Sequence, residues 1–210
     1  MSFSLRAATE QDIPGMIDVW FKSFNTPDFL CVFPDSLTTR NWIAESMSRD
    51  FKYTSRNTFY MVIANDAKEP AIVSFSKWTV HPGGGLVPGW QERWVKELAE
   101  DMDIEIVSGA FFEPMERQHA VTTQDRPHYY LEIVATHEDY QKLGLGSQIL
   151  RWGCDAADAV GYECYLDSAA NAKSLYEKFG YVVVEAAADP KGSLVPMLRS
   201  AKEARIAGSS

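Results

Sequence analysis

The chain's most informative segment reads Gln141-Lys142-Leu143-Gly144-Leu145-Gly146-Ser147. It lies between an apolar run at 130–135, typical of a buried strand, and an amphipathic run at 144–160, typical of a helix. Glycines lack a Cβ atom and let the backbone approach a bulky anion, while the first N–H groups of a helix have no partner within it. The segment therefore predicts a diphosphate site made of backbone donors and assisted by Lys142.

Two other anion-binding loops fit this segment less well. It does not end in the Gly-Lys-Ser/Thr of a P-loop. It also lacks the third glycine of a dinucleotide-binding turn and does not lie in the first βα unit of the chain. A helix start whose glycines serve only tight packing is the remaining alternative that the segment by itself allows.

The rest of the chain divides into short elements separated by clear breaks. The predicted elements are strands at 3–7, 58–64, 71–80 and 163–166, helices from Ile13, at 36–49 and around 172–179, and closing strands at 181–186 and 194–198. An aromatic segment at 24–33, with Pro27 and Pro34, is predicted to be a loop. The length of 210 residues favours one α/β domain over 1–200, followed by a flexible tail at 201–210.

A triple glycine, Gly83-Gly84-Gly85, opens a region with a different pattern. We predict that 81–127 is an insertion between the third and fourth strands, with helices near 90–101 and 104–120. Its aromatic side chains could pack the insertion onto the domain or cover a substrate. The sequence leaves both alternatives open.

Charge and composition exclude several classes of protein. A net charge of −9 repels nucleic acid phosphates, and no basic stripe offsets it, so we expect no nucleic acid partner. No apolar run approaches the roughly 20 residues that span a bilayer, so we expect no membrane insertion. The start lacks the apolar block of a secretory signal, which favours a cytoplasmic protein.

The cysteines and histidines give no metal or redox motif by their spacing. Cys31, Cys154 and Cys164 cannot all pair within one chain, which fits a reducing compartment. The four histidines, at positions 81, 119, 128 and 137, lack metal-ligand spacing as well. We therefore predict no metal.

Two further segments extend the pattern around the glycine turn. They are Leu5-Arg6-Ala7-Ala8-Thr9-Glu10-Gln11-Asp12 near the start and Ser174-Leu175-Tyr176-Glu177-Lys178-Phe179-Gly180-Tyr181 near the end. Together with Val134-Ala135-Thr136-His137-Glu138-Asp139-Tyr140 and the glycine turn, they resemble, in chain order, three motifs of the GNAT superfamily of N-acetyltransferases. Tyr130-Leu131-Glu132, leading into Ala135-Thr136-His137, is similar to a fungal-type branch of that superfamily.

The resemblance implies a fold and a co-substrate. The fold would be a mixed, mostly antiparallel sheet of six to seven strands flanked by helices, with splayed fourth and fifth strands. Acetyl-CoA would place its pantetheine arm along Val134, Ala135 and Thr136, at a bulge at Val134, and its diphosphate on Gln141 to Ser147. Asn171 matches a pantetheine-binding asparagine in type, although it could instead be the N-cap of the next helix.

Transfer of an acetyl group to an amine needs a base, support for the oxyanion and a proton for the thiolate. Backbone N–H groups at the predicted Val134 bulge could face the oxyanion. We expect Tyr176 to be the general acid, because a phenol with a pKa of about 10 stays protonated at pH 7; it could instead be a core tyrosine. Glu132 is the preferred base, because burial raises a carboxyl pKa. Asp167 is the competing candidate; either acid could instead be structural, or the amine could lose its proton through water.

The acceptor is predicted less sharply than the co-substrate. Phe24, Phe29 and Phe33 are expected to line its pocket, which suits a small primary amine, although these rings could also be core. We expect a monomer or a homodimer. A non-catalytic acyl-CoA-binding or regulatory protein is the alternative function, and a nucleotide-binding switch protein is a third.

Overall fold

The structure, a computed structural model, describes residues 2–54, 56–66, 70–84, 88–94, 97–190 and 192–202. The strands are β1 (Phe3–Ala7), β2 (Thr58–Asn65), β3 (Ile72–His81), β4 (His128–Thr136), β5 (Glu163–Ala169), β6 (Val182–Val183) and β7 (Leu194–Arg199). The α-helices are α1 (Ile13–Ser23), α2 (Pro27–Val32), α3 (Leu37–Arg49), α4 (Trp90–Arg93), α5 (Glu113–Thr123), α6 (Leu145–Val160) and α7 (Lys173–Glu177). Two π-helical segments, Asp50–Thr54 and Glu105–Phe112, continue α3 and precede α5.

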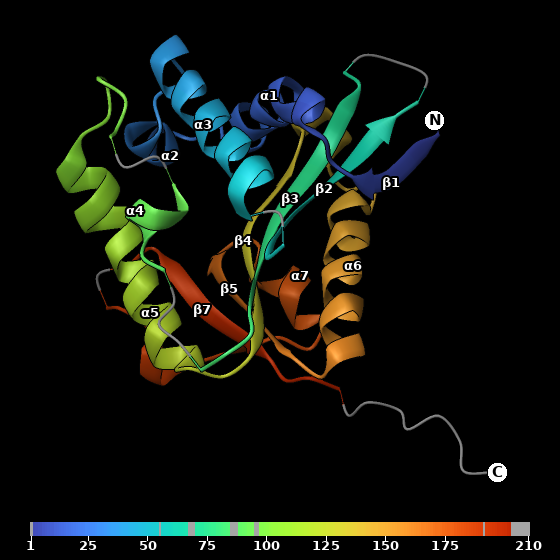
Figure 1. Cartoon of the computed structure of the whole chain (residues 1–210), viewed down its shortest axis with the longest axis vertical. Helices are drawn as coiled ribbons and strands as arrows, with labels where there is room; N and C mark the ends of the chain where they lie inside the picture. The colour runs from blue at the N-terminus through green and yellow to red at the C-terminus, as the bar shows by residue number, and fades with distance from the viewer. Residues whose placement is uncertain are drawn as a thin grey trace.

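The strands form one seven-stranded sheet in the order β1-β2-β3-β4-β5-β7-β6, with helices on both of its faces (Figure 1). Every neighbouring pair among the described strands is antiparallel except β4 and β5. The predicted mixed, mostly antiparallel sheet is therefore confirmed.

The parallel strands β4 and β5 separate after a few residues. Their pairing runs from His128 opposite Glu163 to Leu131 opposite Leu166. Both strands continue beyond that point, β4 to Thr136 and β5 to its own end. The predicted splay is thus present, and it leaves an opening in the middle of the sheet.

The two faces of the sheet bury separate hydrophobic cores. On one face, α1, α3 and the segment between β3 and β4 cover a core that includes Trp20, Phe75 and Phe112. On the other face, α6 and α7 cover a core that includes Trp78 and Leu150. Residues of α6 that are spaced three and four apart supply its buried side, as expected for an amphipathic helix.

α6 approaches the sheet closely at Gly153. A Cβ atom at this position would lie 2.2 Å from Cζ2 of Trp78, whose ring is fully buried. We expect Gly153→Ala to lower the free energy of unfolding by about 2 kcal/mol, the usual scale of overpacking. Thermal unfolding should then occur roughly 4–8 °C lower. Gly109→Ala is the control, because a Cβ atom there meets nothing within 4 Å, and an equal loss in both variants would contradict the packing account.

Three predicted boundaries were wrong. The expected loop at 24–33 contains α2, because Pro27 suits the first helical position and Thr26 Oγ1 accepts a hydrogen bond from the N–H of Phe29 at 3.4 Å. The helix expected at 90–101 ends at Arg93. The strand expected at 181–186 is only Val182–Val183, since the following Glu-Ala-Ala has low strand propensity and forms a 3-10 turn.

Residues 203–210 of the predicted tail lie outside the described residues. Within the described part of the chain, no helix is both long and apolar enough to span a bilayer. The predicted insertion corresponds to the connection between β3 and β4, which carries α4, the second π-helical segment and α5.

Candidate active site

The opening between β4 and β5 continues into a cavity of about 780 Å³. Its walls come from α1, α2, the β3–β4 connection, β4, the glycine turn, β5 and α7. The predicted site residues that line it are Phe24, Phe29, Phe33, Glu132, Val134, Thr136, Gln141, Lys142, Gly144, Leu145, Gly146, Ser147, Asp167, Asn171 and Tyr176. Two predicted residues do not: the Ala135 side chain is buried in the core, and Leu143 is 54% exposed outside the cavity.

The glycine turn has the backbone shape that the sequence predicts. Lys142 and Gly144 both have positive φ angles, 62° and 81°, and α6 begins at Leu145. This reversal of the chain lets the N–H groups of the first helical turn face the cavity without helical partners. The turn is therefore a site of positive potential in a chain of net charge −9.

The free edge of β4 borders the same cavity. From Ile133 to Thr136 the strand pairs with β3 on one side only, so its other edge has no strand partner among the described residues. The Thr136 N–H donates to Ser23 Oγ at 3.3 Å. An extended amide-containing chain can add to such an edge by main-chain hydrogen bonds. The bulge, however, lies at Glu132 and not at Val134, because Lys77 pairs with Ile133 while Trp78 pairs with Leu131.

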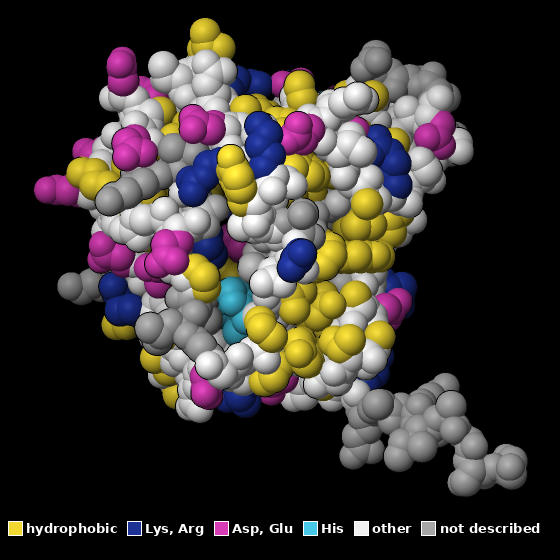
Figure 2. Space-filling model, viewed as in Figure 1, with side chains coloured by type: hydrophobic (Ala, Val, Ile, Leu, Met, Phe, Trp, Pro, Cys, Tyr) yellow, Lys and Arg dark blue, Asp and Glu magenta, His cyan; other side chains and the backbone are white. Residues whose placement is uncertain are grey.

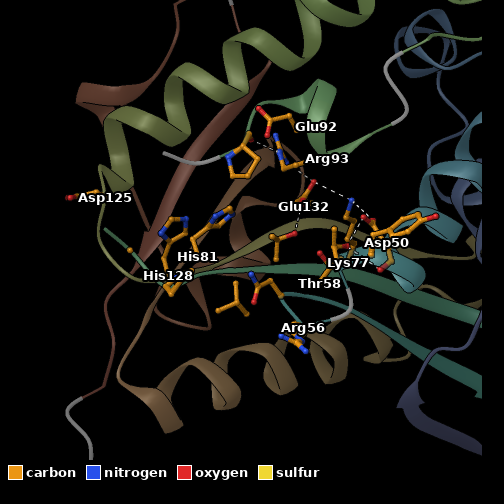
Figure 3. Close-up of a pocket in the computed structure, with 18 of the residues that line it drawn as sticks. Asp50, Arg56, Thr58, Lys77, His81, Glu92, Arg93, Asp125, His128 and Glu132 are labelled. Atoms are coloured by element: carbon orange, nitrogen blue, oxygen red, sulfur yellow. Dashed lines mark hydrogen bonds and ion pairs between the residues drawn. The ribbon is translucent and has the colours of Figure 1, made fainter. Parts of the chain in front are cut away.

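Glu132 lies in a buried network of ion pairs (Figure 3). Its carboxylate accepts a hydrogen bond from Arg93 Nη1 at 2.7 Å and another from Thr79 Oγ1, and Lys77 Nζ lies 3.7 Å away. Lys77 in turn pairs with Asp50 at 2.8 Å. Burial alone would raise the pKa of Glu132, but Arg93 and Lys77 outweigh it and lower the pKa to about 2. The predicted rise was wrong, and Glu132 is a poor proton acceptor at neutral pH.

Asp167 has the opposite environment. It lines the cavity where β5 leaves β4, and its partners are neutral: Tyr165 Oη donates at 2.8 Å, Gln118 Nε2 at 2.7 Å and Tyr130 Oη at 3.4 Å. Burial raises the pKa of Asp167 to about 7, against the lowering effect of these donors. A carboxyl group that titrates near neutrality can accept a proton from an amine and release it to water.

Tyr176 on α7 reaches the cavity from the other side of the opening. Its side chain is largely buried, and its ring packs edge-on against Tyr181 at 5.9 Å. Burial raises the pKa of Tyr176 to about 12, so the phenol stays protonated at pH 7. Asn171 lies in the turn before α7, and the N-cap residue of that helix is Ala172, so Asn171 is not its N-cap.

The three predicted phenylalanines form an aromatic wall in the cavity. The rings of Phe24 and Phe29 are stacked with centroids 4.6 Å apart, and Phe33 follows at 5.2 Å from Phe29. Phe111 of the second π-helical segment meets Phe33 at 5.3 Å. Phe33 itself is only 1% exposed, so this residue is both core and lining.

Sequence reasoning missed the residues that surround the two carboxylates. Gln118 and Arg93 come from the β3–β4 connection, whose aromatic residues also pack into the core, so this segment both packs and lines the cavity. No local pattern indicates these partners. The prediction that spacing excludes a metal is also incomplete, because the fold brings His81, His119 and His128 together.

A comparison with protein families gives one match. Residues 98–183 match the family model described as "Acetyltransferase (GNAT) domain". The matched range contains β4, the glycine turn, Asp167 and Tyr176. No curated protein matches the chain in sequence.

Solved structures share the fold over nearly the whole chain. A histone acetyltransferase HPA2 and related acetyltransferase from Corynebacterium glutamicum is similar with a TM-score of 0.60 and 21% identity, covering 96% of this chain and 98% of that one. A PaiA N-acetyltransferase from Thermoplasma acidophilum, in complex with coenzyme A, gives a TM-score of 0.55 and 15% identity, with coverages of 95% and 99%. The fold is therefore that of GNAT acetyltransferases, and the family match supports a GNAT acetyltransferase domain.

Proposed function

We propose that this protein is a GNAT acetyltransferase that moves the acetyl group of acetyl-CoA to a primary amine of a small molecule. One observation carries the proposal: a single cavity contains the glycine turn, the free edge of β4 and a carboxyl group whose pKa is about 7. The turn suits a diphosphate, the strand edge suits the two amides of pantetheine, and Asp167 suits an amine. The family match and the fold support the same reaction.

In this proposal the co-substrate lies across the opening of the sheet. The N–H groups at the start of α6 bind the diphosphate, with Lys142 adding a positive charge, and the edge from Glu132 to Thr136 pairs with pantetheine. The thioester then lies near the point where β4 and β5 separate, close to Asp167. Gln141 Nε2 donates to the Thr136 carbonyl at 3.2 Å and so fixes the turn against the strand.

The reaction begins with loss of a proton from the acceptor. A carboxylate with a pKa of about 7, in place of 3.8, binds that proton more strongly by about 4 kcal/mol. A poorly hydrated cavity also lowers the pKa of an amine, which reduces the remaining difference. We therefore assign the base to Asp167 and give Glu132 the role of fixing Arg93 and Lys77.

Attack then forms the C–N bond and breaks the C–S bond. The neutral amine nitrogen adds to the acetyl carbon while backbone N–H groups on the open edge of β4 support the oxyanion. Coenzyme A then leaves as the thiolate, and the proton that the nitrogen must still lose to become an amide passes to water. Tyr176 donates a hydrogen bond to that sulfur. Its pKa of about 12 exceeds that of a thiol, about 8.5, so the phenol stabilises the thiolate more than it protonates it.

The acceptor end of the cavity favours a small cation with an apolar or aromatic body. Phe24, Phe29 and Phe111 offer apolar and π surface, while Asp167 offers negative charge. The fungal-type branch, the cytoplasmic location and the monomeric or dimeric state stay predictions from the sequence.

A thiol-release assay tests the proposed function. Purified protein is given acetyl-CoA and a panel of primary amines that includes aliphatic, aromatic and peptide acceptors. We expect free coenzyme A to form with a small-molecule amine, together with the acetylated amine in equal amount. Tight acetyl-CoA binding without thiol release from any acceptor would instead support the non-catalytic alternative.

Replacement of Tyr176 separates its two possible roles. We expect Tyr176→Phe to lower kcat by roughly 10- to 100-fold, because the thiolate loses a hydrogen-bond donor, and to leave the Kd of acetyl-CoA unchanged. Steady-state kinetics and calorimetry measure the two quantities. Tyr181→Phe is the matched control, since this neighbouring ring does not line the cavity. Equal kcat values for Tyr176→Phe and the wild type would show that Tyr176 is only a core residue.

A further inference from the structure

Three of the four histidines form a cluster outside the proposed active site. His81 ends β3, His128 begins β4 directly opposite it in the sheet, and His119 lies on α5. One ring nitrogen from each residue lies within 4.8 Å of the corresponding nitrogens of the other two. The three residues come from separate elements, so their convergence is a property of the fold and is invisible in their sequence spacing.

The three histidines of the cluster are buried. All three side chains are at least nine-tenths buried, which disfavours the charged imidazolium form. Neutral imidazole is the form that binds metals. Two cations lie nearby: Arg93 is paired with Glu132 at 2.7 Å and Glu116 at 3.7 Å, and Arg126 is paired with Glu163 at 2.8 Å.

The hydrogen bonds of His128 orient it as a ligand. Its Nδ1 lies 2.7 Å from the Arg126 carbonyl, which can only accept, so Nδ1 carries the proton. The Nε2 atom of His128 therefore carries no proton, and its lone pair accepts a hydrogen bond from the Nε2–H of His119 at 2.7 Å. Donation of the second ring N–H to a backbone carbonyl is the usual second-shell arrangement of metal-bound histidine. His119 can become a ligand by moving its proton to Nδ1, without a change of charge.

His81 supplies an independent observation. Its side chain is 8% exposed, and its Nε2 is buried without a hydrogen-bond partner among the described residues. An unsatisfied buried nitrogen of this kind is destabilising. A shared metal ion would satisfy it.

The cluster also opens to solvent. A second cavity, of about 560 Å³, is lined by His81 and His128 (Figure 3). Its other charged lining residues are four acids, Asp50, Glu92, Asp125 and Glu132, and four cations, Arg56, Lys77, Arg93 and Arg126. Histidine side chains are visible from outside on the corresponding face of the molecule (Figure 2). An ion can therefore reach the cluster, and water or another small ligand can reach the ion.

We propose that His81, His119 and His128 bind one Zn²⁺ ion, with the remaining coordination position facing the second cavity. Three imidazoles suit zinc, and nitrogens that share a zinc ion at about 2.0–2.1 Å lie roughly 3.4 Å apart. The ligand nitrogens lie within 4.8 Å of one another here, so the rings would have to rotate toward the ion as it binds. The ion ties α5 to both ends of the β3–β4 connection. Gln118, next to His119 on α5, donates a hydrogen bond to Asp167. By fixing His119, the ion would therefore also steady the helix that holds this carboxyl group.

The test is zinc binding by the full chain after removal of metals with a chelator. Competition titration with ZnCl₂ and native mass spectrometry should give one ion per chain. His119→Gln should weaken zinc binding by at least about 100-fold. That loss would exceed the loss expected when a residue only hydrogen-bonds to a metal ligand and does not bind the metal itself. His137→Gln is the matched control, since it lies outside the cluster and should bind zinc as the wild type does. Absence of binding at micromolar zinc, or equal losses in both variants, would overturn the proposal.

Two measurements on the wild type remove any dependence on variant folding. Zinc at a hundredfold excess over Kd should raise the melting temperature by roughly 5–10 °C. The ring ¹⁵N signals of His81, His119 and His128 should shift on zinc addition, while those of His137 stay in place. The absorption spectrum of the Co²⁺-substituted protein should lack a thiolate charge-transfer band, which would exclude the exposed Cys31 as a metal ligand. The presence of such a band would contradict the assignment of the site to three histidines.

Discussion

Asp167→Asn should lower kcat by about 10²- to 10³-fold while leaving the Kd of acetyl-CoA unchanged. Asparagine keeps the shape of the side chain and can still accept a hydrogen bond from Tyr165 or Gln118, but it cannot take a proton from an amine. The wild-type kcat, measured at saturating acceptor, should rise with pH through about 7 as the carboxyl group ionises. This acid limb should be absent in Asp167→Asn.

Glu132→Gln is the control that separates the two carboxylates. Because the pKa of Glu132 is about 2, its ionisation does not change between pH 5 and 9, so the acid limb should persist in this variant. Loss of the Arg93 and Lys77 pairs should lower the melting temperature, since two buried cations lose a partner. An acid limb that disappears in Glu132→Gln and persists in Asp167→Asn would refute the assignment.

The stability of Asp167→Asn gives a second readout of the same pKa. The pKa of Asp167 is raised from 3.8 to about 7 on folding, so protonation of this group stabilises the folded state. That contribution is fully present below about pH 4 and is lost as pH rises through about 7. The melting temperature of the wild type should therefore fall relative to Asp167→Asn across this range.

Gly146→Asp should weaken acetyl-CoA binding by at least about 100-fold. A Cβ atom at this position meets only Thr136 Oγ1 at 3.7 Å, so the apo protein tolerates a side chain there. The added carboxylate would face the diphosphate, and two like charges about 4 Å apart near a protein surface repel by about 4 kcal/mol. In the first turn of α6 the same carboxylate favours the helix, so the melting temperature of the apo protein should stay equal or rise.

Gly146→Asn has nearly the same shape without the charge. It should lose clearly less affinity than Gly146→Asp, and the difference between the two variants should shrink as salt increases. Calorimetric titration with acetyl-CoA at two salt concentrations measures both effects. Equal affinities for the aspartate and asparagine variants would mean that no phosphate lies near this turn.

Much of this architecture could be predicted because local patterns determine it. The glycine turn and the periodicity of 144–160 indicate α6, and the polar segment between two apolar runs indicates the hairpin of β2 and β3. The order of the three motifs, taken with the family that they resemble, led to the splayed sheet. The cavity-lining positions of Asn171 and Tyr176 followed from the same resemblance.

The failures concern contacts between distant segments. The pKa of Glu132 depends on Arg93 and Lys77, which lie 39 and 55 positions away in the chain and meet it only in the folded sheet. The bulge depends on the register with β3, which hydrophobic pattern alone does not fix to one residue. Burial was judged correctly at Glu132, but burial raises a carboxyl pKa only where it outweighs nearby cations, as it does at Asp167, whose hydrogen-bond partners are neutral.

Hydrogen–deuterium exchange with and without coenzyme A tests most directly whether this cavity holds the co-substrate. The amides of Lys142 to Ser147 should become protected when the ligand is added, together with those amides between Glu132 and Thr136 that point away from β3, since both sets donate to it in the proposed complex. Protection confined to other segments, or no change at saturating coenzyme A, would contradict the account.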